Sequence, residues 1–209
     1  PAEGPLLRNP AYAEALEALR DAGAEAFYTG AQARALLAAL EGSPNPSPMT
    51  AGDLAAYRAV ERPAVCVEYR AWEICGMGPP SSGGLTVGQI MGILSHRDLG
   101  ALGDGPEAWR LVAQASGLAF ADRGLYMADA DVVEMPQGLL NPGYLAARAG
   151  ALDAAAPPAA PYAPGEPPWD HARLRAPERQ AERPGTTHLS VVDAGGMVVS
   201  LTSSIETGF

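Results

Sequence analysis

The sequence has little positive charge, only two cysteines and no long apolar run. Lysine and arginine together number 14 against 24 acidic residues, which gives a formal net charge of −10. A chain without a basic stripe has nothing to neutralise phosphates, so this balance argues against a nucleic-acid partner. No apolar stretch approaches the roughly 20 residues that cross a bilayer, so we predict no membrane span.

Neither end of the sequence has the features of a natural terminus. Residues 1–4 lack the charged and apolar regions of a signal peptide. Residues 207–209 follow directly after a predicted strand. We therefore expect the sequence to be an internal piece of a longer protein. Its 209 residues, 47% of them hydrophobic, are enough for one or two globular domains.

The two cysteines lie in a predicted hairpin over residues 64–77. A turn at Arg70 and Ala71 places Cys66 opposite Cys75 in a non-hydrogen-bonded pair, the closer kind of pair. A disulfide is then geometrically possible in an oxidising compartment, and two free thiols fit the sequence as well. No histidine lies near the pair in sequence, so we predict no metal site.

Apolar residues recur at helical spacing in several stretches, which predicts helices. The predicted helices cover residues 9–23, 33–40, 51–57, 86–96 and 106–126. Asn9 and Thr50 are expected caps, Pro10 a first helical residue, Gly23 a stop and Gly30 a break. The first three helices are interpreted as packing scaffold.

The end of the last predicted helix is acidic. Asp122 precedes Arg123, and Asp129 and Asp131 follow, but this spacing lacks the full ligand set of an EF-hand calcium loop. An internal network of Asp122 with Arg123, or helix-end caps, is the use that we predict. The two histidines outside the last hairpin, at positions 96 and 171, are expected at the surface.

A Ser-Ser-Gly-Gly run at residues 81–84 precedes the fourth predicted helix. It is compatible with backbone N–H groups that bind an anion and equally with a rigid turn that carries a capping serine. Ser82 lacks the flanking residues of a nucleophile elbow, so an α/β-hydrolase site is rejected. Further along, prolines interrupt residues 151–185 so often that neither a helix nor a central strand persists. We predict a long, extended and partly mobile connection there.

The last stretch predicts a second hairpin, with strands over residues 186–193 and 197–204. A three-residue loop with a glycine in the left-handed conformation makes Asp193 face Met197. This register places Ser204 opposite Thr186, with Cβ atoms about 5 Å apart. A hydroxyl on the first residue of a strand, directly behind the small Gly185, is where a chain could cut itself and expose a new N-terminal threonine.

Several blocks of the sequence are similar to the γ-glutamyltransferases, also called γ-glutamyl transpeptidases. These N-terminal-nucleophile hydrolases mature by cutting themselves. The resemblance is carried, in order along the chain, by residues 49–57, 60–63, 79–84, 121–123 and 186–209. It implies an α+β fold, an αββα sandwich of which this chain supplies only part. Residues 1–185, with the connection 151–185, would belong to the large subunit and residues 186–209 to the small subunit of one intertwined domain.

The resemblance also implies roles for particular residues. Thr186 matches the nucleophile, and the cut would fall between Gly185 and Thr186. Ser204 matches a threonine that in many members hydrogen-bonds the nucleophile, and Glu206 matches a contact to the substrate amine. The free α-amine of Thr186, with a reference pKa near ~8, would act as the general base. His188 is expected to pack, and Asp193 to cap the hairpin loop.

The implied activity is γ-glutamyl transfer from glutathione or another γ-glutamyl amide to water, an amino acid or a peptide. It would proceed through an ester on Thr186, without a cofactor or metal, in a two-subunit enzyme that is periplasmic or secreted by family habit. The family's α-carboxylate and oxyanion contacts fall outside these residues. Two alternatives stay open. One is a related acylase that cuts cephalosporin, glutaryl or polyglutamate amides; the other is an inactive, unprocessed fragment that serves as scaffold.

Overall fold

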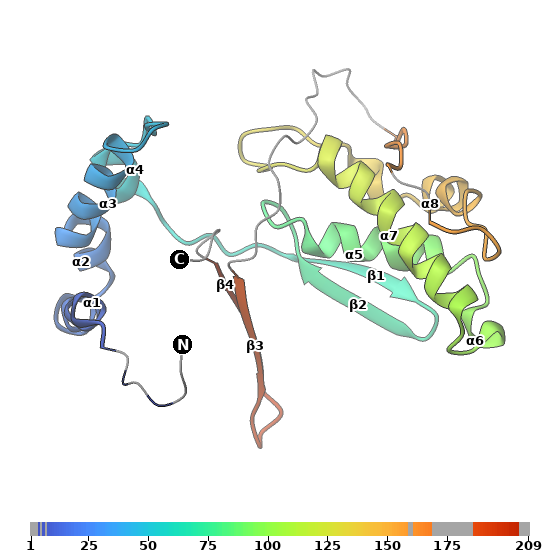
Figure 1. Cartoon of the computed structure of the whole chain (residues 1–209), viewed down its shortest axis with the longest axis horizontal. Coiled ribbons are helices and arrows are strands. Elements are labelled where there is room, and N and C mark those ends of the chain that lie inside the picture. The colour runs from blue at the N-terminus through green and yellow to red at the C-terminus, as the bar shows by residue number, and fades with distance from the viewer. Residues whose placement is uncertain (1–3, 5, 7, 159–160, 169–185, 205–209) are drawn as a thin grey trace. The chain divides into compact units, whose positions relative to one another are not determined.

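The computed structural model describes residues 4, 6, 8–158, 161–168 and 186–204 (Figure 1). By its internal contacts the chain divides into two compact units, Pro1–Glu61 and Arg62–Phe209. Within the described ranges, every helix is too short or too polar to cross a membrane.

The described part of the first unit is helical. Its helices are α1 (Pro10–Ala22), α2 (Ala24–Thr29), α3 (Ala31–Glu41) and α4 (Ala51–Ala56). Asn9 caps α1 by accepting the N–H of Tyr12 at 3.1 Å, and Gly23 ends it with a φ of 66°. The predicted α1, α3 and α4 are confirmed, whereas α2 was not predicted. The break at Gly30 is confirmed, and a Cβ there would lie 2.1 Å from the Ala26 carbonyl oxygen.

A capping box starts α4. The Asp53 N–H donates to Thr50 Oγ1 at 3.3 Å, and the Thr50 N–H donates to Asp53 Oδ2 at 2.7 Å. These reciprocal bonds satisfy two N–H groups that the first turn of a helix leaves unpaired. The hydrogen bonds from the Thr50 side chain and backbone lower the pKa of Asp53 below its ordinary value.

The second unit combines helices with two hairpins. Its elements are β1 (Ala64–Tyr69), β2 (Trp72–Met77), α5 (Gly83–Leu94), α6 (Leu99–Leu102), α7 (Pro106–Tyr126), η1 (Gln137–Leu140), α8 (Pro142–Ala149), β3 (Thr186–Val192) and β4 (Val198–Ser204). The described strands form two separate antiparallel sheets, β1–β2 and β3–β4. Both hairpins and the helices α5 and α7 were predicted. The short α6, η1 and α8 were not.

The β1–β2 hairpin lies against α5 (Figure 1). Its predicted register is confirmed, with Cys66 opposite Cys75 and a tight turn in which Arg70 has a φ of 58°. Of the two alternatives for the cysteines, the structure has the disulfide. Helix and hairpin approach closely at Gly84, where a Cβ would lie 2.7 Å from the Met77 carbonyl oxygen.

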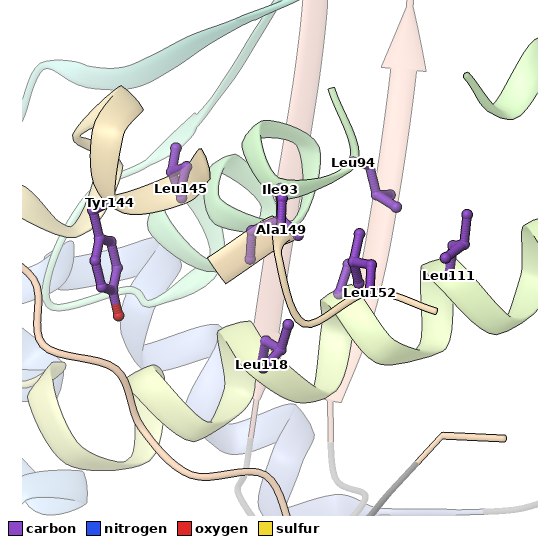
Figure 2. Packing of buried hydrophobic residues seen from close by; sticks show 9 residues of the cluster. Ile93, Leu94, Leu111, Leu118, Tyr144, Leu145, Ala149 and Leu152 are labelled. Atoms are coloured by element: carbon purple, nitrogen blue, oxygen red, sulfur yellow. The ribbon is translucent and has the colours of Figure 1, made fainter. Parts of the chain in front are cut away.

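The main core of the second unit lies between α5, α7 and α8. Its buried members are Ile93, Leu94, Leu111, Ala115, Leu118, Tyr144, Leu145, Ala149 and Leu152 (Figure 2). On α7 the residues Leu111, Ala115 and Leu118 recur at helical spacing and turn one face inward. Trp109 and Phe120 are 62% and 47% exposed because they lie off this face.

Residues 161–168, within the predicted proline-rich connection, have neither helix nor strand, as predicted. They are nevertheless packed. The ring of Tyr162 lies against α7 at Gly117, where a Cβ would be only 2.4 Å from the ring, and Pro167 is buried. This part of the connection is therefore fixed on the helices, a contact that the sequence did not predict.

Candidate active site

The β3–β4 hairpin carries the candidate site, and its predicted register is confirmed. Thr186 pairs with Ser204, and each following pair moves one residue inward until Val192 meets Val198. The Asp193 N–H donates to the Met197 carbonyl at 3.0 Å, which closes the predicted three-residue loop. Gly196 takes the left-handed conformation with a φ of 83°, the position where a glycine is favoured.

Asp193 caps this loop, as predicted. Its Oδ1 accepts the N–H groups of Gly195 at 2.8 Å and Met197 at 2.9 Å. Two backbone donors that the turn leaves without a ladder partner are thereby satisfied. The loop geometry therefore holds the two strands in one register, and this register sets the pairing at their far end.

At that end, two hydroxyl groups are in contact. The Thr186 Oγ1 donates to the Ser204 Oγ at 3.0 Å, across the first pair of the ladder, and both residues are exposed. An accepting oxygen at this distance draws the hydroxyl proton away from Oγ1 and orients it. The pair thus has the geometry of a hydroxyl nucleophile and an orienting neighbour.

One face of the hairpin is polar from Thr186 to Ser190. Because side chains alternate, His188 and Ser190 lie on the same face as Thr186. The His188 Nδ1 lies 2.8 Å from Thr202 Oγ1, and its Nε2 lies 3.2 Å from Ser190 Oγ. His188 therefore joins the strands through hydrogen bonds on an exposed face, which differs from the packed role expected of it.

Two predicted site residues fall outside the described part of the chain. These are Gly185, whose carbonyl would be attacked, and Glu206, the expected contact to the substrate amine. The structure describes Thr186 and Ser204 and brings them together. His171 also falls outside, whereas His96 is exposed as predicted.

Asp122 is internal, as predicted, but the partners that the structure gives it are Arg148, Tyr144 and Gln89 and not its neighbour Arg123. The side chain of Asp122 is fully buried on α7 and lies 3.2 Å from Arg148 Nη2 on α8. Its Oδ2 accepts hydrogen bonds from the Tyr144 hydroxyl at 2.5 Å and from Gln89 Nε2 at 2.9 Å. Burial and the bond to Asp122 raise the pKa of Tyr144 well above its ordinary value. The helical spacing of Asp122 and Leu118 could have indicated that Asp122 is buried, because both residues lie on the same face of α7.

The Ser-Ser-Gly-Gly run has a packing role. The Arg123 Nε donates to Ser82 Oγ at 3.0 Å, and the Thr86 N–H and hydroxyl both donate to the Ser82 carbonyl. Gly84 allows α5 to touch β2. This geometry favours the rigid turn over anion binding. It also gives Arg123 a serine partner that the sequence did not suggest.

Potential metal ligands gather at one place in the described residues, where Cys66, Glu73 and Cys75 lie close together. The two sulfur atoms are joined in a disulfide, so neither is a thiolate that can bind a metal. The described part of the chain therefore offers no built metal centre at this position.

Comparisons with known proteins show what the chain is similar to. A family model described as gamma-glutamyltranspeptidase matches residues 1–209. The chain is 36% identical to a glutathione hydrolase proenzyme of Escherichia coli, over 99% of this chain and 34% of that protein. It is 35% identical to an acylase proenzyme of a Pseudomonas strain, over 93% of this chain and 32% of that protein.

A solved structure is also similar. The crystal structure of Helicobacter pylori gamma-glutamyltranspeptidase matches with a TM-score of 0.64 and 33% identity, over 72% of this chain and 43% of that one. This likeness confirms the predicted α+β fold of the N-terminal-nucleophile hydrolase type. The chain spans about one third of the length of the curated relatives it matches.

Proposed function

The chain belongs to the γ-glutamyltranspeptidase family, whose model matches it from residue 1 to residue 209, and on this basis we propose that the complete protein transfers γ-glutamyl groups. The donor is glutathione or another γ-glutamyl amide, and the acceptor is water or the amine of an amino acid or peptide. Self-cleavage between Gly185 and Thr186 comes first. Similarity to proteins named glutathione hydrolase proenzyme supports this donor class.

One observation carries the proposal, namely the contact between Thr186 and Ser204. Thr186 is the first residue of β3, and its hydroxyl donates to Ser204 at 3.0 Å. Because Thr186 opens the paired strand, the link that would be cut lies directly before the ladder in the sequence. The sequence at that link is Gly185-Thr186, and a glycine leaves its carbonyl uncrowded.

Self-cleavage begins when the Thr186 Oγ attacks the Gly185 carbonyl carbon. A C–O ester bond forms, the peptide C–N bond breaks, and the hydroxyl proton ends on the departing amine. Water then hydrolyses the ester, which gives a carboxylate on Gly185 and restores the Thr186 hydroxyl. The product has a free α-amine on the same residue as the nucleophile.

Turnover repeats the same chemistry on a substrate. The Thr186 α-amine, whose reference pKa is near ~8, accepts the hydroxyl proton while Oγ attacks the γ-carbonyl of the donor. The donor's C–N bond breaks, and its amine leaves with the proton. Water or an acceptor amine then attacks the ester and releases Thr186. We place Glu206 at the substrate ammonium, where a carboxylate makes a charge-assisted hydrogen bond.

The proposal includes a two-subunit enzyme in an oxidising compartment. Residues up to Gly185 belong to the large subunit and residues from Thr186 onward to the small subunit. Export to the periplasm or the medium is supported by the Cys66–Cys75 disulfide, because disulfides persist mainly outside the cytosol.

Intact mass and N-terminal sequencing of the purified complete protein test the proposal. We expect two pieces, with the smaller one beginning at Thr186, and hydrolysis of a γ-glutamyl anilide. A protein that remains uncut while it turns over the anilide would contradict the mechanism. An uncut, inactive protein would support the scaffold interpretation.

A related acylase is the second candidate, because identity to the Pseudomonas acylase proenzyme nearly equals that to the E. coli glutathione hydrolase proenzyme. Both activities use the same N-terminal nucleophile, and they differ in the acyl group bound. Parallel assays of a γ-glutamyl anilide and a glutaryl amide separate them. A higher kcat/KM for the glutaryl compound would favour the acylase.

A further inference from the structure

Residues 163–168 are held by their backbone groups, in the part of the connection that leads toward the proposed cut. The Gly165 N–H donates to Asp122 Oδ1 at 2.7 Å, and the Gly165 carbonyl accepts from the Tyr126 hydroxyl at 2.6 Å. The Arg148 Nη2 donates to the Ala163 carbonyl at 3.0 Å. We call the side chains of Asp122, Tyr126 and Arg148 the tail anchor.

The tail anchor is itself fixed. Asp122 is 0% exposed and Arg148 13% exposed, and their ion pair joins α7 to α8. The Tyr144 hydroxyl bonds the other carboxylate oxygen, Oδ2, and points from α8 toward α7 (Figure 2). Charge-assisted bonds to a buried carboxylate are strong, so the Gly165 amide meets a rigid acceptor.

Gly165 fits this anchor because it has no side chain. A Cβ at this position would lie 2.3 Å from the Tyr144 hydroxyl oxygen and 2.9 Å from Arg148 Cδ. Contacts this short would push the backbone away from Asp122 and Tyr126. The tail anchor thus binds the segment through its backbone groups, and the missing side chain of Gly165 lets that backbone approach the buried ion pair.

We propose that the tail anchor positions the chain for the cut at Gly185–Thr186, an inference that rests on the proposed function. With the anchor in place, Pro168 is held through the Gly138 N–H at 3.2 Å, and 17 residues separate it from Thr186. We expect displacement of Gly165 to release its neighbours Tyr162 and Pro168 as well. The last held residue is then Ala156, whose carbonyl accepts from Gln114, and 29 residues separate it from Thr186.

The change in chain length sets the expected size of the effect. The entropic cost of bringing two points on a chain together grows with the logarithm of the number of residues between them. For these two lengths, the same relation gives self-cleavage slower by about twofold when the anchor is lost. We therefore assign Asp122, Tyr126 and Arg148 a positioning role, which acts through the chain and not on the reacting atoms.

The test compares Gly165→Ala with two matched variants in the complete protein. Gly52→Ala adds the same methyl group where a Cβ has an ordinary 3.5 Å contact. Ile93→Val loosens the buried core without touching the anchor. For each variant, hydrogen exchange at residue 165, the melting temperature and the rate of cutting are measured. If Gly165→Ala fails to fold, Tyr126→Phe replaces it. The rate of cutting alone then decides, because the Gly165 N–H still donates to Asp122 in that variant.

We expect the anchor variant to lose protection of its residue-165 amide and to cut about twofold more slowly. Ile93→Val and Gly52→Ala should cut at the wild-type rate well below their melting temperatures. Loss of protection with unchanged cutting overturns the inference. So does unchanged protection, because the contacts would then not hold the segment.

Failure of the proposed function gives a different result. A wild-type protein that is never cut refutes self-cleavage, whatever the exchange data show. A wild-type protein that is cut at Thr186 at the same rate as the anchor variants refutes only the positioning role.

Discussion

The two hairpins share one topology but use their side chains differently. In β1–β2 half-buried residues alternate with exposed ones along β1, and α5 contacts both strands. In β3–β4 every residue of both strands is exposed. The first hairpin therefore contributes to packing, whereas the second presents a polar face with hydroxyl groups.

The difference is clearest in one pair of each ladder. Cys66 and Cys75 face each other and are joined covalently, which closes the pair to further chemistry. Thr186 and Ser204 also face each other, but they are joined only by a hydrogen bond. Directly opposed positions bring side chains close in both hairpins. The residue type decides whether the pair forms a covalent cross-link or leaves a hydroxyl group available for reaction.

The largest effect is expected from removal of the nucleophile in the second hairpin. Thr186→Ala should prevent cutting and lower turnover by at least about a thousandfold, because the nucleophile is lost. Thr186→Ser keeps a hydroxyl and should still be cut. Gel analysis and anilide hydrolysis measure both effects. Equal cutting of the alanine variant and the wild type would contradict the role of Thr186.

The next effect concerns packing in the first hairpin. Gly84→Ala should lower the free energy of unfolding by about 2 kcal/mol, because the added Cβ would overlap the backbone of β2. Gly83→Ala, one residue earlier in α5, has an ordinary 3.5 Å contact and should be nearly neutral. Denaturant unfolding of the complete protein compares them. Similar losses in both variants would show that Gly84 is not a close-packing position.

A smaller effect is expected at the partner of the nucleophile. Ser204→Ala removes one hydrogen bond to Thr186 and should lower kcat/KM about tenfold, which corresponds to about 1.4 kcal/mol. Ser203→Ala, on the opposite face of β4, is the matched control and should change it little. If both variants lose the same activity, the effect belongs to the strand and not to the Thr186 contact.

The smallest effect lies at the entrance to the first hairpin, where Arg62 pairs with Asp131. The hydrogen bond from Arg62 lowers the pKa of Asp131 below its ordinary value of 3.8. A lowered folded-state pKa means that the pair stabilises the fold above that ordinary value. This stabilisation is lost as the pH falls through the folded-state pKa.

Arg62→Gln should return the Asp131 pKa toward its ordinary value, as measured by NMR titration of the carboxyl carbon. The pKa of Asp53 is the internal control, because Thr50 rather than Arg62 holds it low. If the pKa of Asp131 is unchanged in this variant, Arg62 is not the cause of its lowered value.

Local signals made much of the fold predictable. Asn9 and Pro10 mark the start of α1 through a cap that reaches only to Tyr12. The glycine loop at 194–196 fixes the pairing of Thr186 with Ser204. In both cases the deciding contacts are formed by neighbours in sequence. The family motif then assigned a nucleophile to a position that the register had already singled out.

The unpredicted parts depend on distant partners. The partners of Asp122 are 22 to 43 residues away in the sequence, and no local pattern indicates them. They are Gln89, Tyr144, Arg148 and Gly165. The helix α8 was missed although Asn141 and Pro142 repeat the start signal of α1. It is only eight residues long, and its burial depends on packing against α5.

The ladder of the second hairpin has a consequence for maturation. All seven of its pairs, from Thr186–Ser204 to Val192–Val198, lie on the C-terminal side of the proposed scissile link. Hydrolysis there would break no hydrogen bond between the strands. The small subunit would begin with a strand that is already formed, and its new terminal ammonium group would arise beside a hydroxyl pair that needs no rearrangement.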